Sequence, residues 1–102
     1  MYGTRFEWDP VKAAANLRKH GVSFEIAMRA FADPFALTHL DRVEGGEQRW
    51  QTLGAVEGRV LLLVAHTVGD EDEDGEPVEI IRIISARAAD GQERRRYEQE
   101  TR

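Results

Sequence analysis

Cysteine is absent from the 102-residue chain. The absence excludes disulfide bonds, thiolate metal sites and a cysteine nucleophile, and it is typical of proteins that work in a reducing cytoplasm. No apolar run approaches the roughly 20 residues that a membrane-spanning helix needs. The first residues, MYGTRFEWD, lack the basic-then-apolar order of a signal peptide. We therefore expect a cytoplasmic protein that does not enter a membrane.

Histidine is scarce as well, and the three histidines, His20, His39 and His66, lie far apart in the sequence. They form none of the closely spaced pairs that metal sites use. The acidic residues do not follow the Asp, Asn and Gly spacing of a calcium loop. Glycine-rich phosphate loops, dinucleotide fingerprints and serine nucleophile elbows are also missing. We expect no metal ion and no cofactor.

The charge of the chain is unevenly spread. A length of 102 residues suits one domain, and we take residues 1–102 as a single unit. The formal net charge is −5, but seven acidic side chains lie within residues 70–79, DEDEDGEPVE. Without these seven, the 19 acidic residues fall to 12 against 14 basic ones, a balance of +2. Since local patches decide whether a phosphate backbone is attracted, the total charge does not exclude an RNA partner.

The first third of the chain predicts one strand and two helices. Residues 5–8 alternate polar and apolar side chains, as a half-buried strand does. Asp9 and Pro10 read as an N-cap and first helical residue, so we expect a helix over 10–20 that ends at Gly21. Ser23 is the next N-cap candidate, and a helix to about residue 32 buries Phe24, Ala27, Met28 and Phe31 on one face.

The remainder predicts four strands and a final helix. We place the strands at residues 35–40, 49–55, 60–68 and 78–86, with loops at 41–47 and 70–77. The runs 60–65 and 80–84 are apolar on both faces and should form central strands. Asp90 and Glu93 resemble a capping box for a helix that reaches about residue 100. This order favours an α+β fold with a largely antiparallel sheet.

Four polar residues of the first predicted helix form a candidate phosphate-binding stripe. At about 100° per residue, this stripe carries Lys12, Asn16, Lys19 and His20. Ala13 and Leu17 lie beside it and are expected to face the core. Two lysines, an amide and an imidazole suit contact with phosphate and transfer of a proton. The alternative is that basic side chains in a last helical turn only complement the helix dipole.

Two arginines near the end of the last predicted strand are the second group of candidates. Arg82 lies inside the apolar run 80–84, where an unpaired buried charge would cost several kcal/mol. It therefore either forms a buried ion pair with a carboxylate such as Glu7 or Glu47, or binds a phosphate. Arg87 lies where the strand ends, a position well suited to hold a phosphate through two parallel hydrogen bonds.

Two further residues have open interpretations. His66 closes the apolar run 60–65, where a histidine is either a satisfied structural group or a proton carrier. Tyr97 lies one helical turn beyond Arg94 and either packs or orients a substrate. His39 has no polar neighbour that suggests chemistry, and we assign it no role.

The order of several short motifs resembles one bacterial protein family. The motifs are FEWDP (6–10) with Lys12, NLRKHGVSF (16–24) with Ala27, FADP (31–34), and IRIISAR (81–87) with Glu93, Arg94 and Tyr97. Each motif is weak alone, but together they cover nearly the whole chain in the right order. The set resembles the BrnT toxins of bacterial type II toxin–antitoxin systems.

The resemblance implies a RelE-like fold, in which a mostly antiparallel sheet is joined by two N-terminal helices and one C-terminal helix. It also implies an endoribonuclease that arrests translation by cutting RNA. Such toxins are held inactive by a small BrnA-like antitoxin whose other end is a DNA-binding ribbon-helix-helix unit. Operator DNA would therefore be contacted only through the antitoxin.

The resemblance also gives the candidate residues roles in metal-independent RNA cleavage. His20 and His66 would move protons, while Lys19, Arg82 and Arg87 would neutralise the phosphate. Tyr97 would orient the substrate. RNA contacts would come from Lys12, Asn16, Arg94 and Arg95. Which histidine is the acid and which the base stays open.

Two other classes of function remain as alternatives. One is a degenerate toxin, a non-catalytic antitoxin-binding module that acts only in operon repression. The other is a free-standing RNA-binding domain, which would need exposed aromatic residues among basic ones. We instead expect Trp8 and Trp50 to be strand residues that face the core, which disfavours the RNA-binding domain.

The chain also departs from the family pattern at two places. Ala88 follows Arg87 where a second basic residue is common, and the loop at 70–79 is long and acidic. Both differences weaken attraction to RNA. We expect the acidic loop either to shield the site or to contact a basic part of the antitoxin.

Overall fold

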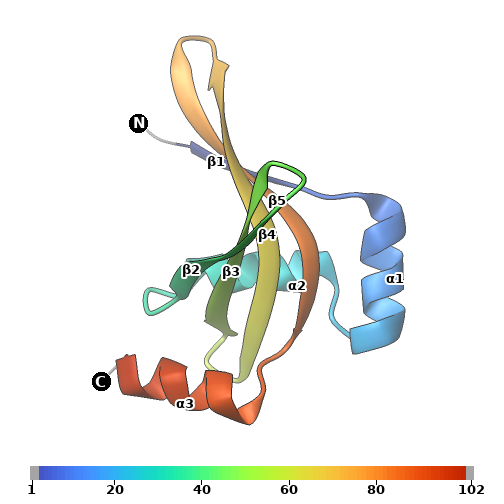
Figure 1. Cartoon of the computed structure of the whole chain (residues 1–102), viewed down its shortest axis with the longest axis vertical. Helices are drawn as coiled ribbons and strands as arrows, with labels where there is room; N and C mark the ends of the chain where they lie inside the picture. Colours follow the sequence, from blue (N-terminus) through green and yellow to red (C-terminus); the bar gives the residue numbers. More distant parts are fainter. Residues whose placement is uncertain (1–2, 101–102) are drawn as a thin grey trace.

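Five strands form one sheet in the order β1-β5-β4-β3-β2, with helices on both of its faces (Figure 1). The computed structural model describes residues 3–100. Its elements are β1 (Gly3–Glu7), α1 (Pro10–His20), α2 (Phe24–Arg29), the 3-10 helix η1 (Ala30–Ala32), β2 (Leu37–Glu44), β3 (Glu47–Val56), β4 (Val60–Glu73), β5 (Glu76–Ala88) and α3 (Gly91–Glu100). β1 is parallel to β5, and the other neighbouring pairs are antiparallel. The predicted α+β fold is confirmed.

Local sequence signals fix the helix ends as predicted. The Asp9 carboxylate accepts a hydrogen bond from the backbone N–H of Val11, and Gly21 ends α1 with a left-handed φ of 70°. The Ser23 hydroxyl accepts from the N–H of Ile26 at the start of α2. Asp90 and Glu93 each accept from the other's backbone N–H, which is the capping box of α3.

The main core lies between the sheet and helices α1 and α2. Its buried members are Phe24, Ala27, Ala30, Val56, Leu62, Val64, Ile81, Ile83 and Ala86. Trp8 packs against this core with its ring on that of Phe24, although it follows β1 and does not belong to it. Gly54 allows β3 to pass close to η1, because a Cβ there would collide with the carbonyl oxygen of Ala30.

A smaller cluster lies on the other face of the sheet, because successive strand residues point to opposite faces. It contains Leu53, Leu61, Leu63 and Ala89, with Tyr97 of α3 packed against it. Helix α3 buries none of its own residues. It therefore covers one end of this face and leaves the rest open.

The acidic segment is not a loop, and this prediction was wrong. Residues 70–73 pair with residues 76–79 and extend the β4–β5 hairpin to a turn at Asp74 and Gly75. Both turn residues have positive φ angles, 53° and 80°, which is the hairpin geometry that Asp-Gly favours. The hairpin projects beyond the rest of the sheet (Figure 1). We call residues 70–79 the acidic arm.

Other predicted boundaries also moved. The loop expected at 41–47 is mostly strand, because β2 runs to Glu44 and turns at Gly45 and Gly46. The second helix splits into α2 and the 3-10 helix η1. None of the helices within residues 3–100 has the length and apolar character to cross a membrane.

Two residues of α1 have the opposite exposure to that predicted. Leu17, expected to face the core, is 51% exposed, whereas Asn16 is only 6% exposed. The Asn16 amide donates to the carbonyl oxygens of Val22 and Ala86 at 2.9 Å, and its oxygen accepts from the N–H of Ala86 at 3.0 Å. These bonds hold α1 against β5. The buried backbone groups need a hydrogen-bonding partner, so an amide is buried at a position that the periodicity predicted to be exposed.

Candidate nucleic-acid interface

The candidate site is the part of one sheet face that α3 leaves uncovered. The register of the strands shows which residues lie on it. Because cross-strand partners point to the same face, Thr67 and its partner Arg82 lie on the side away from α1 and α2. The same reasoning places His39 opposite Gln51, and Gln51 opposite Ala65, which pairs with Ser85. We call this surface the open face. Its polar members are His39, Glu47, Arg49, Gln51, Thr67, Arg82, Ser85 and Arg87, and the pairing of β1 with β5 adds Arg5 and Glu7, which lies opposite Arg82.

Arg82 is exposed on the open face, which excludes the alternative of a buried ion pair with Glu7 or Glu47. The strand is central, as predicted, because β5 lies between β1 and β4. A central strand of a mixed sheet is buried on both faces only when both are covered, and α3 does not reach this part of β5. Within residues 3–100 Arg82 forms no ion pair, and its guanidinium is therefore available to an anion.

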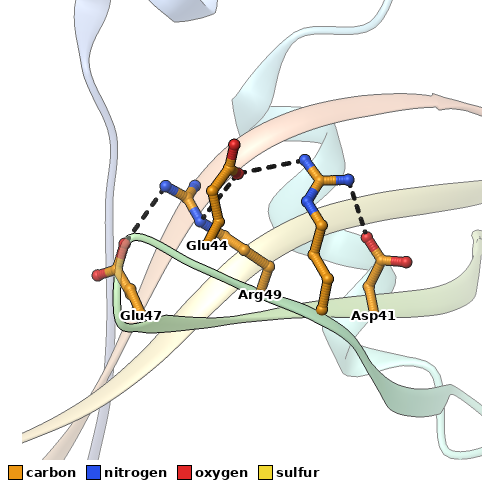
Figure 2. A network of polar contacts seen from close by, with 5 residues as sticks. Asp41, Glu44, Glu47 and Arg49 are labelled. Atoms are coloured by element: carbon orange, nitrogen blue, oxygen red, sulfur yellow. Dashed lines mark hydrogen bonds and ion pairs between the residues drawn. The ribbon is translucent and has the colours of Figure 1, made fainter.

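Arg49 lies on the same face, close to the turn of the β2–β3 hairpin (Figure 2). Its Nη2 lies 3.4 Å from a Glu47 oxygen, and its Nε lies 3.9 Å from a Glu44 oxygen. Arg42 contacts that same Glu44 oxygen at 3.3 Å and Asp41 at 3.4 Å. The Nε of Arg49 is buried without a hydrogen bond. These loose contacts leave Arg49 only partly neutralised.

Arg87 lies at the border between the open face and α3. Its Nη1 and Nη2 donate to the two Glu93 oxygens at 2.8 and 2.9 Å, and Nη1 also donates to the carbonyl oxygen of Ala88 at 3.1 Å. These bonds raise the pKa of Arg87 above its ordinary value. They also hold the pKa of Glu93 below its ordinary value, so the pair is ionised at neutral pH.

Tyr97 ties α3 to the chain between η1 and β2. Its hydroxyl donates to the Asp33 carboxylate at 2.5 Å. Burial and this hydrogen bond raise the pKa of Tyr97 to about 12. A hollow of about 530 Å³ lies beside this contact and is lined in part by Arg29 and Phe35. The observed contacts of Tyr97 position α3, and its predicted part in orienting a substrate stays a prediction.

His66 is buried on the side of the sheet that faces α2. It is 1% exposed, and its ring packs edge-on against Phe31. Its Nε2 shares a 2.7 Å hydrogen bond with the Thr52 hydroxyl, and its Nδ1 lies 3.3 Å from the carbonyl oxygen of Thr67. Burial lowers the pKa of His66 and favours the neutral ring. The structure therefore separates His66 from the open face.

The candidates on α1 lie at the edge of the sheet, beside β5. Asn16 bonds to the backbone N–H and carbonyl of Ala86, which lie in the plane of the sheet, so α1 packs along the edge of β5 beyond the end of β1 (Figure 1). Lys12, Lys19 and His20 are exposed on this helix. Arg94 and Arg95 are exposed on α3, next to the open face. Arg82 and Arg87 thus share one sheet face with the α3 arginines beside it, and within residues 3–100 no hydrogen bond or ion pair joins them to Lys12, Lys19 or His20.

Sequence reasoning missed three residues of the open face. Arg49 and Gln51 belong to β3, and His39 belongs to β2. His39 is half-buried and lines a hollow of about 330 Å³ with Arg96 of α3. The alternation of Arg49 and Gln51 was a visible signal, but their alignment with Arg82 depends on strand register.

The open face therefore offers cations, hydrogen-bonding side chains and one histidine, together with the carboxylates of Glu7 and Glu47, on a shallow surface. Guanidinium groups on such a surface suit contact with phosphates of an RNA backbone. Among residues 3–100, no three His, Asp or Glu side chains come together as a group that would hold a metal ion.

Comparison with known proteins identifies the family. The family model described as "Ribonuclease toxin, BrnT, of type II toxin-antitoxin system" matches residues 8–93. The chain belongs to the BrnT family. It is accordingly the toxin member of a toxin–antitoxin system, in a family described as ribonucleases. No curated protein matches the chain.

A solved BrnT structure supports the fold of this family member. The 1.1 Å crystal structure of the Brucella abortus ribonuclease toxin, BrnT, is similar to it with a TM-score of 0.57 and 21% sequence identity. The similarity covers 88% of this chain and 97% of the Brucella chain. Three helices and a mostly antiparallel five-stranded sheet agree with the RelE-like fold expected from the sequence.

Proposed function

We propose that this BrnT-family toxin is a metal-independent endoribonuclease whose site is the open face of the sheet. The observation that carries the proposal is the placement of Arg49, Arg82 and Arg87 on one sheet face, with Arg82 outside any ion pair of the described chain. Charge that develops on the phosphate during cleavage needs preorganised donors of this kind. The family's description as a ribonuclease toxin supplies the substrate class.

The proposed reaction is attack of a ribose 2′-OH on the adjacent phosphate. It requires a base for the 2′-OH, cations for the charged phosphorane and an acid for the leaving 5′ oxygen. Arg82 and Arg87 supply the cations. His39 on the open face and His20 at the end of α1 are the two solvent-accessible histidines for proton transfer. His66 would need to leave the core to take part.

The proposed partner is a BrnA-like antitoxin with a ribbon-helix-helix DNA-binding unit. A type II toxin family implies an antitoxin partner. In this proposal the free toxin acts in the cytoplasm and arrests translation by cutting RNA. The complex contacts operator DNA only through the antitoxin. Lys12, Lys19, Arg94 and Arg95 are proposed additional RNA contacts.

The second candidate function is a non-catalytic antitoxin-binding module. The observation that favours it is the ion pair of Arg87 with Glu93. An arginine whose charge is already paired suits an antitoxin-binding surface as well as it suits an enzyme. Loss of toxicity in Arg87→Ala with retained antitoxin binding would exclude this alternative. Equal toxicity of the variant and the wild type would support it.

Cleavage of a defined RNA in excess EDTA tests the proposed site. We expect Arg82→Ala to lower kcat/KM by about 100-fold, as loss of one transition-state donor does. The slope of the logarithm of the RNA-binding constant against the logarithm of salt concentration should also decrease by about the contribution of one phosphate contact. Arg18→Ala is the matched control, because Arg18 is exposed on α1 and does not belong to the open face. Equal activity of both variants would place the site elsewhere.

A further inference from the structure

Glu93 joins the end of β5 to the start of α3 through a single carboxylate. Its Oε1 accepts from Arg87 Nη1 at 2.8 Å and from the backbone N–H of Asp90 at 2.9 Å. Its Oε2 accepts from Arg87 Nη2 at 2.9 Å. Its side chain is only 16% exposed. The group that caps α3 is therefore also the group that holds Arg87.

We propose that Glu93 is a positioning residue that aims the Arg87 guanidinium at an RNA phosphate. This inference rests on the proposed function, since it assumes that Arg87 contacts the phosphate. It assigns Glu93 a role that acts through Arg87 and requires no contact of its own with RNA.

The donors of Arg87 indicate which part of the guanidinium is left for RNA. A guanidinium has five N–H donors in one plane. Glu93 takes one from Nη1 and one from Nη2, and the carbonyl oxygen of Ala88 takes another from Nη1. The Nε–H and the second Nη2–H remain, and these two point the same way along one edge. Parallel donors on one edge are the geometry that binds a phosphate bidentately.

The pair fixes this edge in place without burying it. The Arg87 side chain remains 39% exposed, and we take its free edge to be part of that exposed surface. An arginine held at its tip by two hydrogen bonds loses rotamer freedom before the substrate arrives. Preorganisation of this kind favours catalysis because ordering is not required during the reaction.

Electrostatic attraction and positioning predict opposite effects for loss of the Glu93 charge. Glu93 neutralises Arg87, so its removal makes the site more positive and should strengthen RNA binding if charge alone matters. If Glu93 positions Arg87, its removal should lower kcat even when binding improves. The unpaired Arg82 supplies the attraction in either case. A separation of kcat from KM therefore distinguishes the two roles.

Glu93→Gln is the sharpest variant, because glutamine also fits the third position of a capping box. The variant retains the start of α3 and loses the charged, bidentate acceptor. We expect kcat for a defined RNA in EDTA to fall about tenfold or more, as for small misplacements of catalytic groups. KM should stay unchanged or decrease. Glu98→Gln, an exposed change on the same helix, is the control and should retain wild-type kcat.

A double-mutant cycle shows whether Glu93 acts through Arg87. In an Arg87→Lys background, which lacks the guanidinium fork, Glu93→Gln should cause no further loss of kcat. An equal loss in both backgrounds, or wild-type kcat in Glu93→Gln, would overturn the inference. If Glu93→Gln unfolds by circular dichroism, Glu93→Asp replaces it and is expected to lower kcat through its shorter reach, with wild-type kcat again contradicting the proposal.

The wild type separates failure of this inference from failure of the proposed function. If folded wild type cuts RNA and Glu93→Gln cuts equally well, the positioning role alone is lost. If folded wild type cuts no RNA, the proposed function fails and the role of Glu93 fails with it.

Discussion

Asp33 is the residue on which the position of α3 depends. Its carboxylate accepts hydrogen bonds from the backbone N–H groups of Phe35 and Ala55 at 2.9 and 2.8 Å, in addition to the Tyr97 hydroxyl. Burial acts to raise the pKa of Asp33, but these hydrogen bonds outweigh it and hold the pKa below its ordinary value. One side chain thus links η1, β3 and α3.

Tyr97→Phe tests this link while keeping the ring. We expect the free energy of unfolding to fall by about 1–2 kcal/mol at neutral pH, because one hydrogen bond to a charged acceptor is lost. The pKa of Tyr97 is raised to about 12, against about 10 in an unfolded chain. The stabilisation is therefore fully present below pH 10 and is lost as the pH rises towards 12. Denaturant titrations from pH 7 to 12 measure the difference between the two proteins.

A difference that stays constant through pH 12 would show that the phenol does not donate to Asp33. Equal stability of the two proteins at pH 7 would show that other contacts hold α3. Asp33→Asn is the partner variant, and it should remove most of the pH dependence of the Tyr97 effect.

At the level of single residues, sequence reasoning misjudged exposure and position. Arg82 was selected because a buried charge is unusual, yet it is exposed. His39 was given no role because its sequence neighbours are uninformative, and it lies on the open face opposite Gln51. Which face of a strand receives a covering helix is a tertiary property, and local sequence does not encode it.

At the scale of elements, prediction succeeded where the determining interactions are local. The start of α1 at Pro10 and the start of α3 follow from capping groups within three residues. It failed for the acidic arm, where seven carboxylates suggested a solvated loop. The Asp74-Gly75 turn and the ion pairs from Arg5 to Glu71 and Glu73 hold that segment as a hairpin.

The acidic arm is expected either to repel RNA from the open face or to bind a basic antitoxin segment. Changing Asp70, Asp72 and Asp74 together to Asn removes three of the seven negative charges of the arm and leaves both Arg5 ion pairs in place. If the arm repels RNA, affinity at low salt should rise severalfold and the gain should fade as salt screens the charges. If it binds antitoxin, antitoxin affinity should fall. Glu25→Gln on α2 is the control.

The affinities of this variant for RNA and for antitoxin distinguish the two roles of the arm. Asn tolerates the left-handed conformation at position 74, so the hairpin turn is expected to persist. Unchanged affinity for both partners would contradict each role for the arm.

At the scale of the whole molecule, charge and topology divide the surface into distinct regions. The net charge of −5 is concentrated in the arm, which projects past the sheet (Figure 1). The strand arginines lie on the open face, and Lys12, Lys19 and His20 lie on α1 at the edge of the sheet. The fold class was readable from the order of elements. The site was not, because it forms only when register aligns β2, β3, β4 and β5.

The measurement that tests the central claim most directly is the chemistry of the ends that the purified, antitoxin-free toxin leaves on a defined RNA in excess EDTA. Attack by the 2′-OH predicts 2′,3′-cyclic phosphate or 3′-phosphate ends paired with 5′-hydroxyl ends, and their loss in Arg82→Ala and Arg87→Ala proteins that remain folded. Cleavage that stops in EDTA, or 5′-phosphate ends paired with 3′-hydroxyl ends, would contradict a metal-independent ribonuclease site on the open face.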